Sequence, residues 1–187
     1  AALLHSQWVT GDYWDRHKVA KRDRPIPPAK MAKRIQALAA KAPTTLPWRT
    51  VRDAIADLPD PRTRAAAAIR DHKFQDGAKV YPGHTGSPLD QPAKTIKAGA
   101  HGVPGGENMM VLPDGSVRYF SARETARIQT FPDGYVFHGS WTETMRQLGN
   151  AVPVALGRIV ASSVGEALIR AEINQLRATV GSARVAA

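Results

Sequence analysis

Residues 121–154 read SARETARIQTFPDGYVFHGSWTETMRQLGNAVPV, and this stretch sets the architecture of the C-terminal part of the chain. The pattern S-x-x-E occurs in it twice, from Ser121 and from Ser140, and each copy can form a capping box at the start of a helix. The letters PDG stop the first predicted helix, and Gly149 is expected to end the second. Pro153 suits the start of a third helix. The stretch therefore predicts three consecutive helices.

The third predicted helix is long and apolar on a wide face. It runs to about Ala178 and carries large apolar side chains at Ile159, Val160, Val164, Leu168, Ile169, Ile173 and Leu176. Helical periodicity gathers such side chains on one side, where they need a packing partner. The remaining chain offers few helices or strands to match this face. We therefore expect the helix to pack on something sizeable that the chain itself does not supply.

Loops dominate residues 44–120, which precede these helices. Thr50 can cap a short helix over residues 51–55, and a further helical turn is predicted at 65–70. Glycines and prolines interrupt the stretch 80–106 too often for a long element. The sequence PDGS favours a hairpin between two short strands. Strands are predicted at 93–97, 109–112 and 117–120.

Residues 1–46 form a basic segment. Nine Lys or Arg face three Asp there, so this quarter of the chain carries +6 of the net charge of +10. A helix is predicted over residues 29–41, with one apolar stripe formed by Met31, Ile35 and Leu38. Two interpretations remain open, a packed surface helix and a helix that lies along phosphates.

The composition narrows the class of protein. The 187 residues include 26 Lys or Arg and 16 Asp or Glu, an excess that favours a polyanionic partner such as nucleic acid over a merely solvated basic surface. The chain contains no cysteine, which excludes disulfides, thiolate metal sites and a cysteine nucleophile. No continuous apolar run approaches the length of a membrane span. We expect a soluble, cytoplasmic protein without a membrane partner.

The search for catalytic or metal-ligating patterns gives weak signals. Asp12, Asp15 and His17 could be imagined as ligands of a metal nuclease, but their spacing is not diagnostic and exposed polar residues are the simpler interpretation. The pair Glu107 and Asn108 lies in a glycine-rich loop without a strand pattern, so it is not interpreted as a catalytic pair. No metal site is predicted.

Four segments, in order, carry a family resemblance. Residues 121–135 (SARETARIQTFPDGY) resemble motif IX of the DNA (cytosine-5)-methyltransferases, and residues 146–154 (RQLGNAVPV) resemble motif X. Residues 92–96 (PAKTI) are similar to a Thr-Ile signature in the target recognition region of that family. Residues 47–59 (PWRTVRDAIADLP) are similar to a stretch common in bacterial members. The motif X segment has Pro-Val where many members have Pro-Pro.

The resemblance implies a chemistry that the chain holds only in part. Enzymes of this family flip a cytosine out of DNA, attack C6 with a cysteine, and transfer a methyl group from S-adenosylmethionine to C5. The chain lacks that cysteine and the F-x-G-x-G cofactor motif. The resemblance therefore implies an α+β chain divided into a basic arm and helix (1–46), a small irregular β-containing target recognition region (47–120) and motif IX and X helices (121–187). These helices would pack on an absent Rossmann-like α/β methyltransferase domain.

The resemblance also assigns roles by position. It implies that Thr95 contacts a DNA phosphate; the charges of Lys94 and Lys97 suit further phosphates, and groups on the recognition loops can read base edges. Asn150, Ala151 and Val152 match the turn that borders the cofactor. Arg123, Glu124 and Arg127 match the residues that organise the recognition region. The predicted DNA-binding set is Thr95, Lys94, Lys97, Tyr81, His84, Thr85 and His101.

Several interpretations stay open. The chain is either the smaller subunit of a split methyltransferase or a fragment of a single-chain enzyme, and the absence of an initial Met favours a fragment. In both cases the partners would be double-stranded DNA and an N-terminal portion or separate subunit carrying motifs I to VIII. A stand-alone DNA-binding module that has lost catalysis is the alternative, although the intact GNAV of motif X argues against it.

Overall fold

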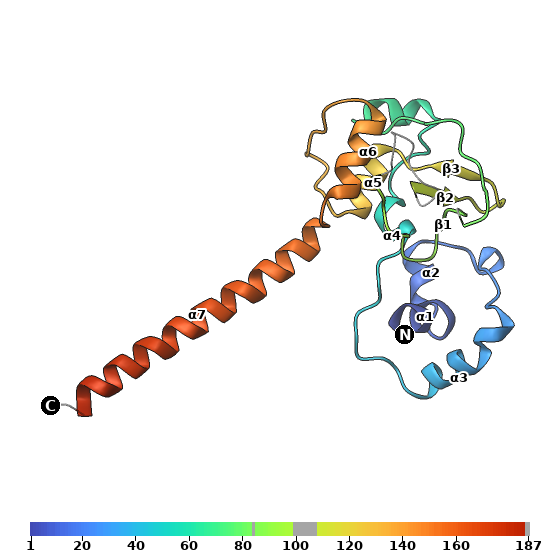
Figure 1. Ribbon diagram of the computed structural model, residues 1–187. Coiled ribbons are helices and arrows are strands. Elements are labelled where there is room, and N and C mark those ends of the chain that lie inside the picture. The colour runs from blue at the N-terminus through green and yellow to red at the C-terminus, as the bar shows by residue number, and fades with distance from the viewer. Residues whose placement is uncertain (84, 99–107, 186–187) are drawn as a thin grey trace.

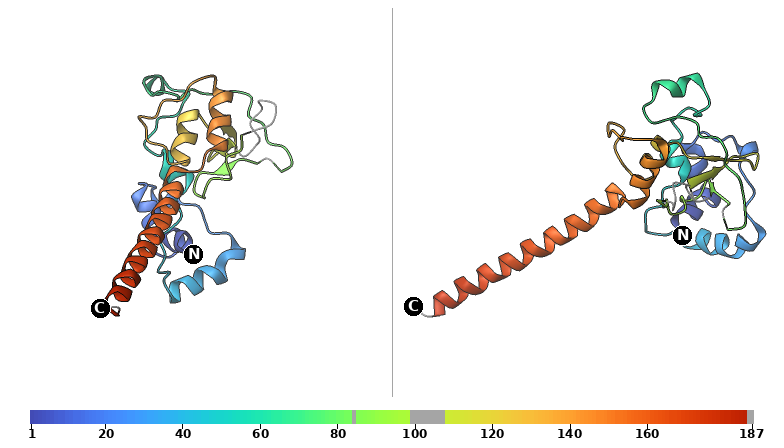
Figure 2. Two further views of the ribbon diagram at one scale, coloured as in Figure 1. Left: turned by 60° about the vertical axis from the view of Figure 1, so that its left-hand side comes forward. Right: turned by 45° about the horizontal axis from the view of Figure 1, so that its top comes forward.

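The computed structural model describes residues 1–83, 85–98 and 108–185, with side chains as far as residue 176. Three groups of elements are visible in Figure 1: N-terminal helices α1 to α3, a central unit of short strands and helices, and the long helix α7. The right-hand view in Figure 2 also shows α7 projecting away from the other elements. The described part of the chain is thus mixed helix and sheet, compatible with the α+β prediction.

The sheet is small and is built on the predicted hairpin. Strands β2 (Met109–Val111) and β3 (Val117–Tyr119) are antiparallel, and Met110 lies opposite Arg118. The short strand β1 (Ser87–Pro88) pairs parallel to β2 and gives the order β1-β2-β3. The prediction of a strand at 93–97 is wrong. Side chains occupy its backbone donors: Ser87 Oγ accepts from the Lys94 N–H, and Asn108 Oδ1 accepts from the Lys97 N–H.

Two apolar clusters hold the central unit together. One contains Val51 and Ile55 of α4 (Val51–Ile55), packed with Ile96, Met110 and Phe120. The other joins α5 (Ala122–Ile128) to α6 (Trp141–Asn150), with a core of Ala126, Phe137, Met145 and Leu148. Helices α4 and α5 also contact each other, so the two clusters belong to one packed unit.

The predicted caps are present, with one exception. Thr50 and Ser121 each form a complete capping box, with Asp53 and Glu124 respectively. At Ser140 only half of the box forms, because the carboxylate of Glu143 pairs with Arg146 instead of reaching back to the cap. Helix α6 also continues through Gly149 to Asn150, one residue past the predicted end.

The N-terminal segment is docked on the central unit instead of hanging free. Helices α1 (Ala2–Trp8) and α2 (Asp12–Arg16) pack together, and the buried hydroxyl of Tyr13 lies 2.9 Å from Thr50 Oγ1 and 2.8 Å from Asp90 Oδ1. Burial raises the pKa of Tyr13 above its usual range, and its hydrogen bonds with Thr50 and Asp90 have opposing smaller effects. Arg16 and His17 both reach the carboxylate of Asp53 in α4, at 2.7 and 2.8 Å.

Helix α3 (Ala32–Ala40) packs against α1 and follows a short 3-10 turn, Ala29–Met31. The predicted helix over 29–41 is therefore present, and its first turn is tighter than an α-helix. Two further 3-10 turns occur at Lys21–Asp23 and Arg64–Ala68. The second begins one residue before the helical turn predicted at 65–70. Packing against α1 supports the surface-helix interpretation of this segment.

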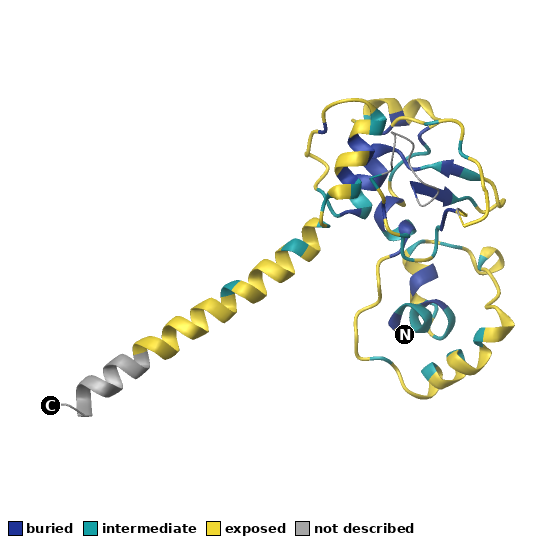
Figure 3. Cartoon of the chain, viewed as in Figure 1, coloured by how far each residue is buried: buried dark blue, intermediate teal, exposed yellow. Residues whose placement is uncertain are grey.

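Helix α7 (Val154–Val185) is longer than predicted and is exposed along its described side chains (Figure 3). Ile159, Leu168 and Leu176 are each 60% exposed or more. Residues 141–176 are long and apolar enough, by length and composition, to cross a membrane. The sequence predicted no apolar run of this length, because Arg158, Ser162 and Glu166 interrupt the continuous runs. The average over the helix nevertheless stays apolar.

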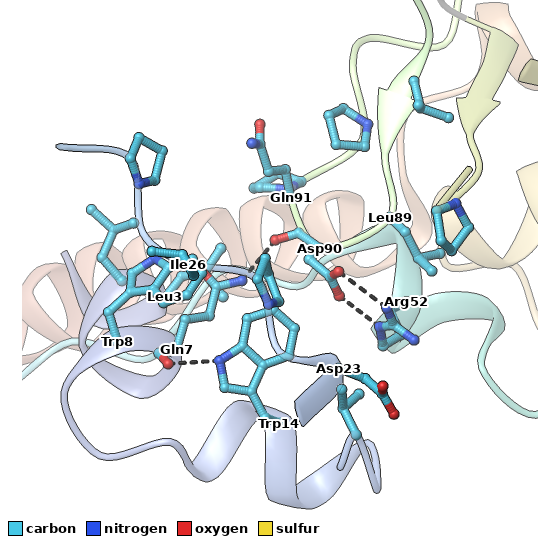
Figure 4. A pocket seen from close by; sticks show the side chains of 18 of the residues that line it. Leu3, Gln7, Trp8, Trp14, Asp23, Ile26, Arg52, Leu89, Asp90 and Gln91 are labelled. Carbon is cyan, nitrogen blue, oxygen red and sulfur yellow. Dashed lines mark hydrogen bonds and ion pairs between the residues drawn. The ribbon is translucent and has the colours of Figure 1, made fainter. Parts of the chain in front are cut away.

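A large cavity of about 840 Å³ separates the N-terminal segment from the loop after β1. Figure 4 shows its mostly apolar wall, the hydrogen bond from Trp14 Nε1 to the Gln7 carbonyl and the ion pair between Arg52 and Asp90. The predicted site residues that the structure describes do not line it. Several of the predicted site residues line a different cavity, which is described next.

Candidate nucleic-acid interface

A second cavity, of about 440 Å³, lies where four separate segments of the chain meet. Residues 49–50 lead into α4, residues 92–96 follow β1, residues 127–130 end α5, and residues 149–153 join α6 to α7. The cavity therefore brings together the predicted recognition region and the segments that resemble motifs IX and X. Predicted residues from all three, namely Lys94, Thr95, Arg127 and Ala151, line it.

Thr95 and Lys94 belong to the part of this wall that residues 92–96 contribute. Thr95 is exposed, and its neighbour Ile96 is buried in the core, which fixes the position of the segment. The ammonium of Lys94 donates a hydrogen bond to Thr85 Oγ1 at 2.8 Å. Two predicted DNA-contacting residues that lie nine positions apart in sequence are thus in direct contact.

The backbone of Lys97 is held by a side chain that the sequence did not single out for function. Asn108 is fully buried; its Oδ1 accepts from the Lys97 N–H at 3.2 Å, and its Nδ2 donates to the Lys97 carbonyl at 2.9 Å. The amide thus replaces a pair of sheet hydrogen bonds. No pattern in the sequence indicated this role.

Arg123 and Glu124 organise the motif IX helix from inside. Arg123 is 1% exposed and donates to the carbonyl of Arg70 at 3.1 Å and to that of Tyr135 at 3.0 Å. Glu124 makes a two-pronged ion pair with buried Arg118, at 2.6 and 2.7 Å, while it also caps the helix. Both side chains are thereby engaged within the chain and do not face a ligand.

Arg127 lies at the edge of the cavity as a fixed positive charge. Its guanidinium donates to Asp133 at 2.6 and 2.8 Å and to Asp57 at 2.5 Å. The hydrogen bond with Asp133, assisted by Asp57, raises the pKa of Arg127 further above its usual range, against the opposing effect of partial burial. The charge is therefore permanent, and the two carboxylates hold its orientation.

The end of α5 holds the turn between α6 and α7. The side-chain amide of Gln129 donates to the Leu148 carbonyl at 2.8 Å, and its backbone carbonyl accepts from the Val154 N–H at 3.0 Å. Thr130 Oγ1 accepts from the Ala155 N–H at 2.8 Å. Thr130 has φ +61°, a strained conformation for a β-branched residue. Sequence analysis missed both residues because backbone angles leave no sequence signal here.

The remaining predicted residues are placed as follows. Asn150 and Val152 are exposed on the turn beside Ala151, and Tyr81 and Lys97 are also exposed, but these four do not line the cavity. His84 and His101 lie outside the described residues. Arg49, which the sequence analysis did not select, is exposed and contributes a further cation to the wall.

The three residues of the metal-nuclease hypothesis each pair with a different side chain of the chain. Asp12 hydrogen-bonds to Thr10, Asp15 pairs with Arg24, and His17 pairs with Asp53. Across residues 1–83, 85–98 and 108–185, no group of three His, Cys, Asp or Glu is arranged to hold a metal ion. These pairings give the three residues structural partners within the chain.

Comparison with known proteins identifies the family. The family model for C-5 cytosine-specific DNA methylases matches residues 16–166, so the chain belongs to this family. It is 39% identical over 77 residues to the type II methyltransferase M.AplI of Arthrospira platensis, a match that covers 41% of this chain and 22% of that protein. It is 51% identical over 51 residues to M.AgeI of Thalassovita gelatinovora, covering 27% of this chain and 12% of the relative.

A third type II methyltransferase, M.HindV of Haemophilus influenzae, is 37% identical over 81 residues, which cover 41% of this chain and 27% of that protein. The chain thus spans about a quarter or less of these curated relatives. No solved structure matches the chain significantly. The family prediction made from the four motifs is confirmed.

Proposed function

We propose that this chain is the DNA-recognition and cofactor-pocket-completing part of a DNA (cytosine-5)-methyltransferase. The assembled enzyme would transfer a methyl group from S-adenosylmethionine to C5 of cytosine within a specific DNA sequence. The chain would be inactive alone because it contains no cysteine to attack the base. We also propose that this enzyme would work in the bacterial cytoplasm, in association with DNA.

The observation that carries this proposal is the cavity of about 440 Å³ that joins Thr95 to the motif X turn. Arg49, Lys94 and Arg127 line it. Arg127 is already paired with Asp57 and Asp133, so Arg49 and Lys94 are the cations that suit the phosphates of a DNA strand. Thr95 adds a hydroxyl donor for a phosphate oxygen. The tyrosine and threonine on the loop before β1, Tyr81 and Thr85, would then face the bases.

The motif X turn fits one border of a cofactor site and no more than that. Asn150 presents an exposed amide at the end of α6, and Ala151 and Val152 follow it without helix or strand structure. An amide beside small apolar side chains suits the polar and apolar parts of a nucleoside. S-adenosylmethionine, when bound, would supply the methyl group. Asn150, Ala151 and Val152 would contribute one wall, and the absent domain the rest.

Helix α7 supports an absent partner within the same enzyme. Its exposed apolar residues include Val160, Val164 and Leu168, spaced four apart, and a soluble protein rarely leaves so large a surface uncovered. Packing on a Rossmann-like α/β domain that carries motifs I to VIII would cover it. That domain would belong to the same polypeptide or to a separate large subunit.

A stand-alone DNA-binding module remains the second candidate, since the cations of the cavity alone would serve it. Both candidates predict binding of the 187-residue chain to duplex DNA, with an affinity that falls steeply as salt rises. Lys94→Ala should weaken binding about fivefold and lower the salt slope by about one, because one phosphate contact is lost. Lys41→Ala, which removes an exposed lysine far along the chain from the cavity, is the matched control.

Reconstitution separates the candidates. The chain is mixed with the portion that carries motifs I to VIII, and transfer of labelled methyl from S-adenosylmethionine to DNA is measured. Restored transfer would support the methyltransferase. A chain that binds duplex but restores no activity with any such portion would support the stand-alone module.

A further inference from the structure

Asn108 holds the backbone of the segment that carries Thr95, the residue proposed to contact a DNA phosphate. This residue is 0% exposed, and its amide binds both the N–H and the carbonyl of Lys97. The backbone carbonyl of Asn108 accepts from the Phe120 N–H at 2.9 Å, next to the β2–β3 pairing. The amide therefore ties the backbone two residues after Thr95 to the edge of the sheet.

Gly149 of α6 approaches the same backbone very closely. A Cβ placed on Gly149 would lie 2.2 Å from the Ala98 nitrogen and 2.4 Å from the Lys97 carbonyl carbon. Both are backbone atoms, so no rotamer change could relieve the overlap. Helix α6 can approach this segment closely only because residue 149 has no side chain.

We propose that Asn108 and Gly149 are positioning residues that clamp the Lys97–Ala98 backbone between the sheet and α6. The inference rests on the proposed function, in which Thr95 grips DNA and Asn150 borders the cofactor. The clamp lies between them: Thr95 is two residues before Lys97, and Asn150 directly follows Gly149. It therefore fixes the distance between the DNA-contacting hydroxyl and the cofactor wall.

The two sides of the clamp are independent of each other. The Asn108 side depends on hydrogen bonds that a substitution can remove, and the Gly149 side depends on close packing that a single methyl group would disrupt. If both act on the same backbone, then two chemically unrelated substitutions should produce the same defect. That shared defect is the signature to test.

The experiment compares Gly149→Ala, Asn108→Leu and Asn108→Asp in the 187-residue chain. Gly134→Ala is the matched control, because a Cβ at Gly134 meets no atom within 4 Å and its φ is not positive. Affinity for a labelled DNA duplex is measured by anisotropy. Hydrogen exchange of the Lys97 amide is measured by nuclear magnetic resonance. Folding of each variant is checked by circular dichroism.

Gly149→Ala and Asn108→Leu are each expected to weaken duplex binding at least about fivefold and to speed exchange of the Lys97 amide at least about tenfold. Gly134→Ala should match the wild type in both measurements. Asn108→Asp should retain part of the protection, because its carboxylate can still accept from the Lys97 N–H. If Gly149→Ala fails to fold, the two Asn108 variants decide the question.

Variants that exchange faster but bind duplex as tightly as the wild type would overturn the clamp and leave the proposed function standing. Variants that match the wild type in both measurements would also overturn it. A wild-type chain that does not bind duplex would overturn the proposed function, and the clamp with it.

Discussion

At the residue scale, the motif IX glutamate has two structural tasks. Glu124 caps α5 and neutralises Arg118, and both side chains are less than 10% exposed. Desolvating a charge is costly unless a partner stays in place, so the pair is far more sensitive to losing one member than a surface pair is. The motif is thus explained by folding and needs no direct contact with DNA.

Glu124→Gln is expected to lower the free energy of unfolding by about 3 kcal/mol, because it leaves Arg118 charged and buried without a counter-ion. Urea unfolding followed by fluorescence would measure the loss. Glu143→Gln, the same change at the same position of the next helix, should cost less than about 1 kcal/mol, since its pair with Arg146 is exposed. Equal losses in the two variants would contradict this account.

Asp53 makes stability depend on pH. Burial alone would raise its pKa, but hydrogen bonds from Thr50, His17 and Arg16 outweigh burial and lower the pKa below the usual 3.8. A depressed folded-state pKa contributes stability above pH 3.8, and the contribution is lost as the pH falls through the lower folded value. Asp60, whose pKa Arg62 lowers to about 2, acts in the same direction.

We therefore expect the urea midpoint of the wild type to fall between pH 4 and pH 2. Asp53→Asn should be less stable at pH 6 by about 1 kcal/mol, the usual cost of a weakened helix cap, and should show a flatter decline in acid. Unfolding curves at pH 6, 4, 3 and 2 would test this. A variant that keeps the full wild-type slope would show that other groups control the acid transition.

At the scale of elements, the local signals in the sequence were reliable. The caps at Thr50 and Ser121, the PDGS hairpin and the start of α7 after Pro153 follow from residue chemistry within a few positions, and all are present. The prediction of a strand at 93–97 was wrong because side chains of the flanking loops, Ser87 and Asn108, accept from its backbone N–H groups. Such tertiary contacts leave no periodic pattern.

The candidate site was predictable to a similar extent. Motif resemblance selected Thr95, Arg127 and Ala151, charge selected Lys94, and the fold places all four around one cavity. Other predicted residues do not line it: Tyr81, Lys97, Asn150 and Val152. Gln129 and Thr130 were missed, because their roles depend on where α7 begins and on a positive φ at Thr130. These features follow from how the elements pack and not from residue type.

Thr130 offers a test at the junction of α5 and α7. Thr130→Gly removes the strain of a β-branched residue at φ +61° but also removes the hydroxyl that accepts from the Ala155 N–H. The two effects oppose each other, so the free energy of unfolding should change by less than about 1 kcal/mol. The Ala155 amide should nevertheless exchange faster.

Thr130→Asn is the matched comparison, because asparagine tolerates this conformation and keeps an acceptor oxygen. It should protect the Ala155 amide better than glycine does. Equal exchange in the glycine and asparagine variants would show that the hydroxyl does not cap α7.

At the scale of the whole molecule, α7 is the feature that the chain alone does not explain. Its apolar residues are exposed along the described helix, whereas the two clusters of the central unit are closed. Membership of the cytosine methylase family and the short coverage of its relatives favour a protein partner for this face over a lipid one.

Leu168→Glu should therefore leave the unfolding of the 187-residue chain almost unchanged, because the side chain is already 65% exposed. It should abolish reconstitution with the portion that carries motifs I to VIII, because a carboxylate would be buried at the contact. Ser163→Glu adds the same charge on the polar side of the helix, which it shares with Glu166 and Arg170, and is the control. Full activity of the Leu168 variant would exclude this face as the docking surface.

The bonds from Gln129 and Thr130 to the first N–H groups of α7 have a consequence for assembly. They fix the direction of the helix before any partner arrives, so little orientational freedom remains to be lost on association. A preorganised surface binds more tightly than a flexible one of equal area. If α7 docks on the proposed motif I to VIII portion, the association rate should be set by diffusion and surface fit, and not by reorientation of the helix.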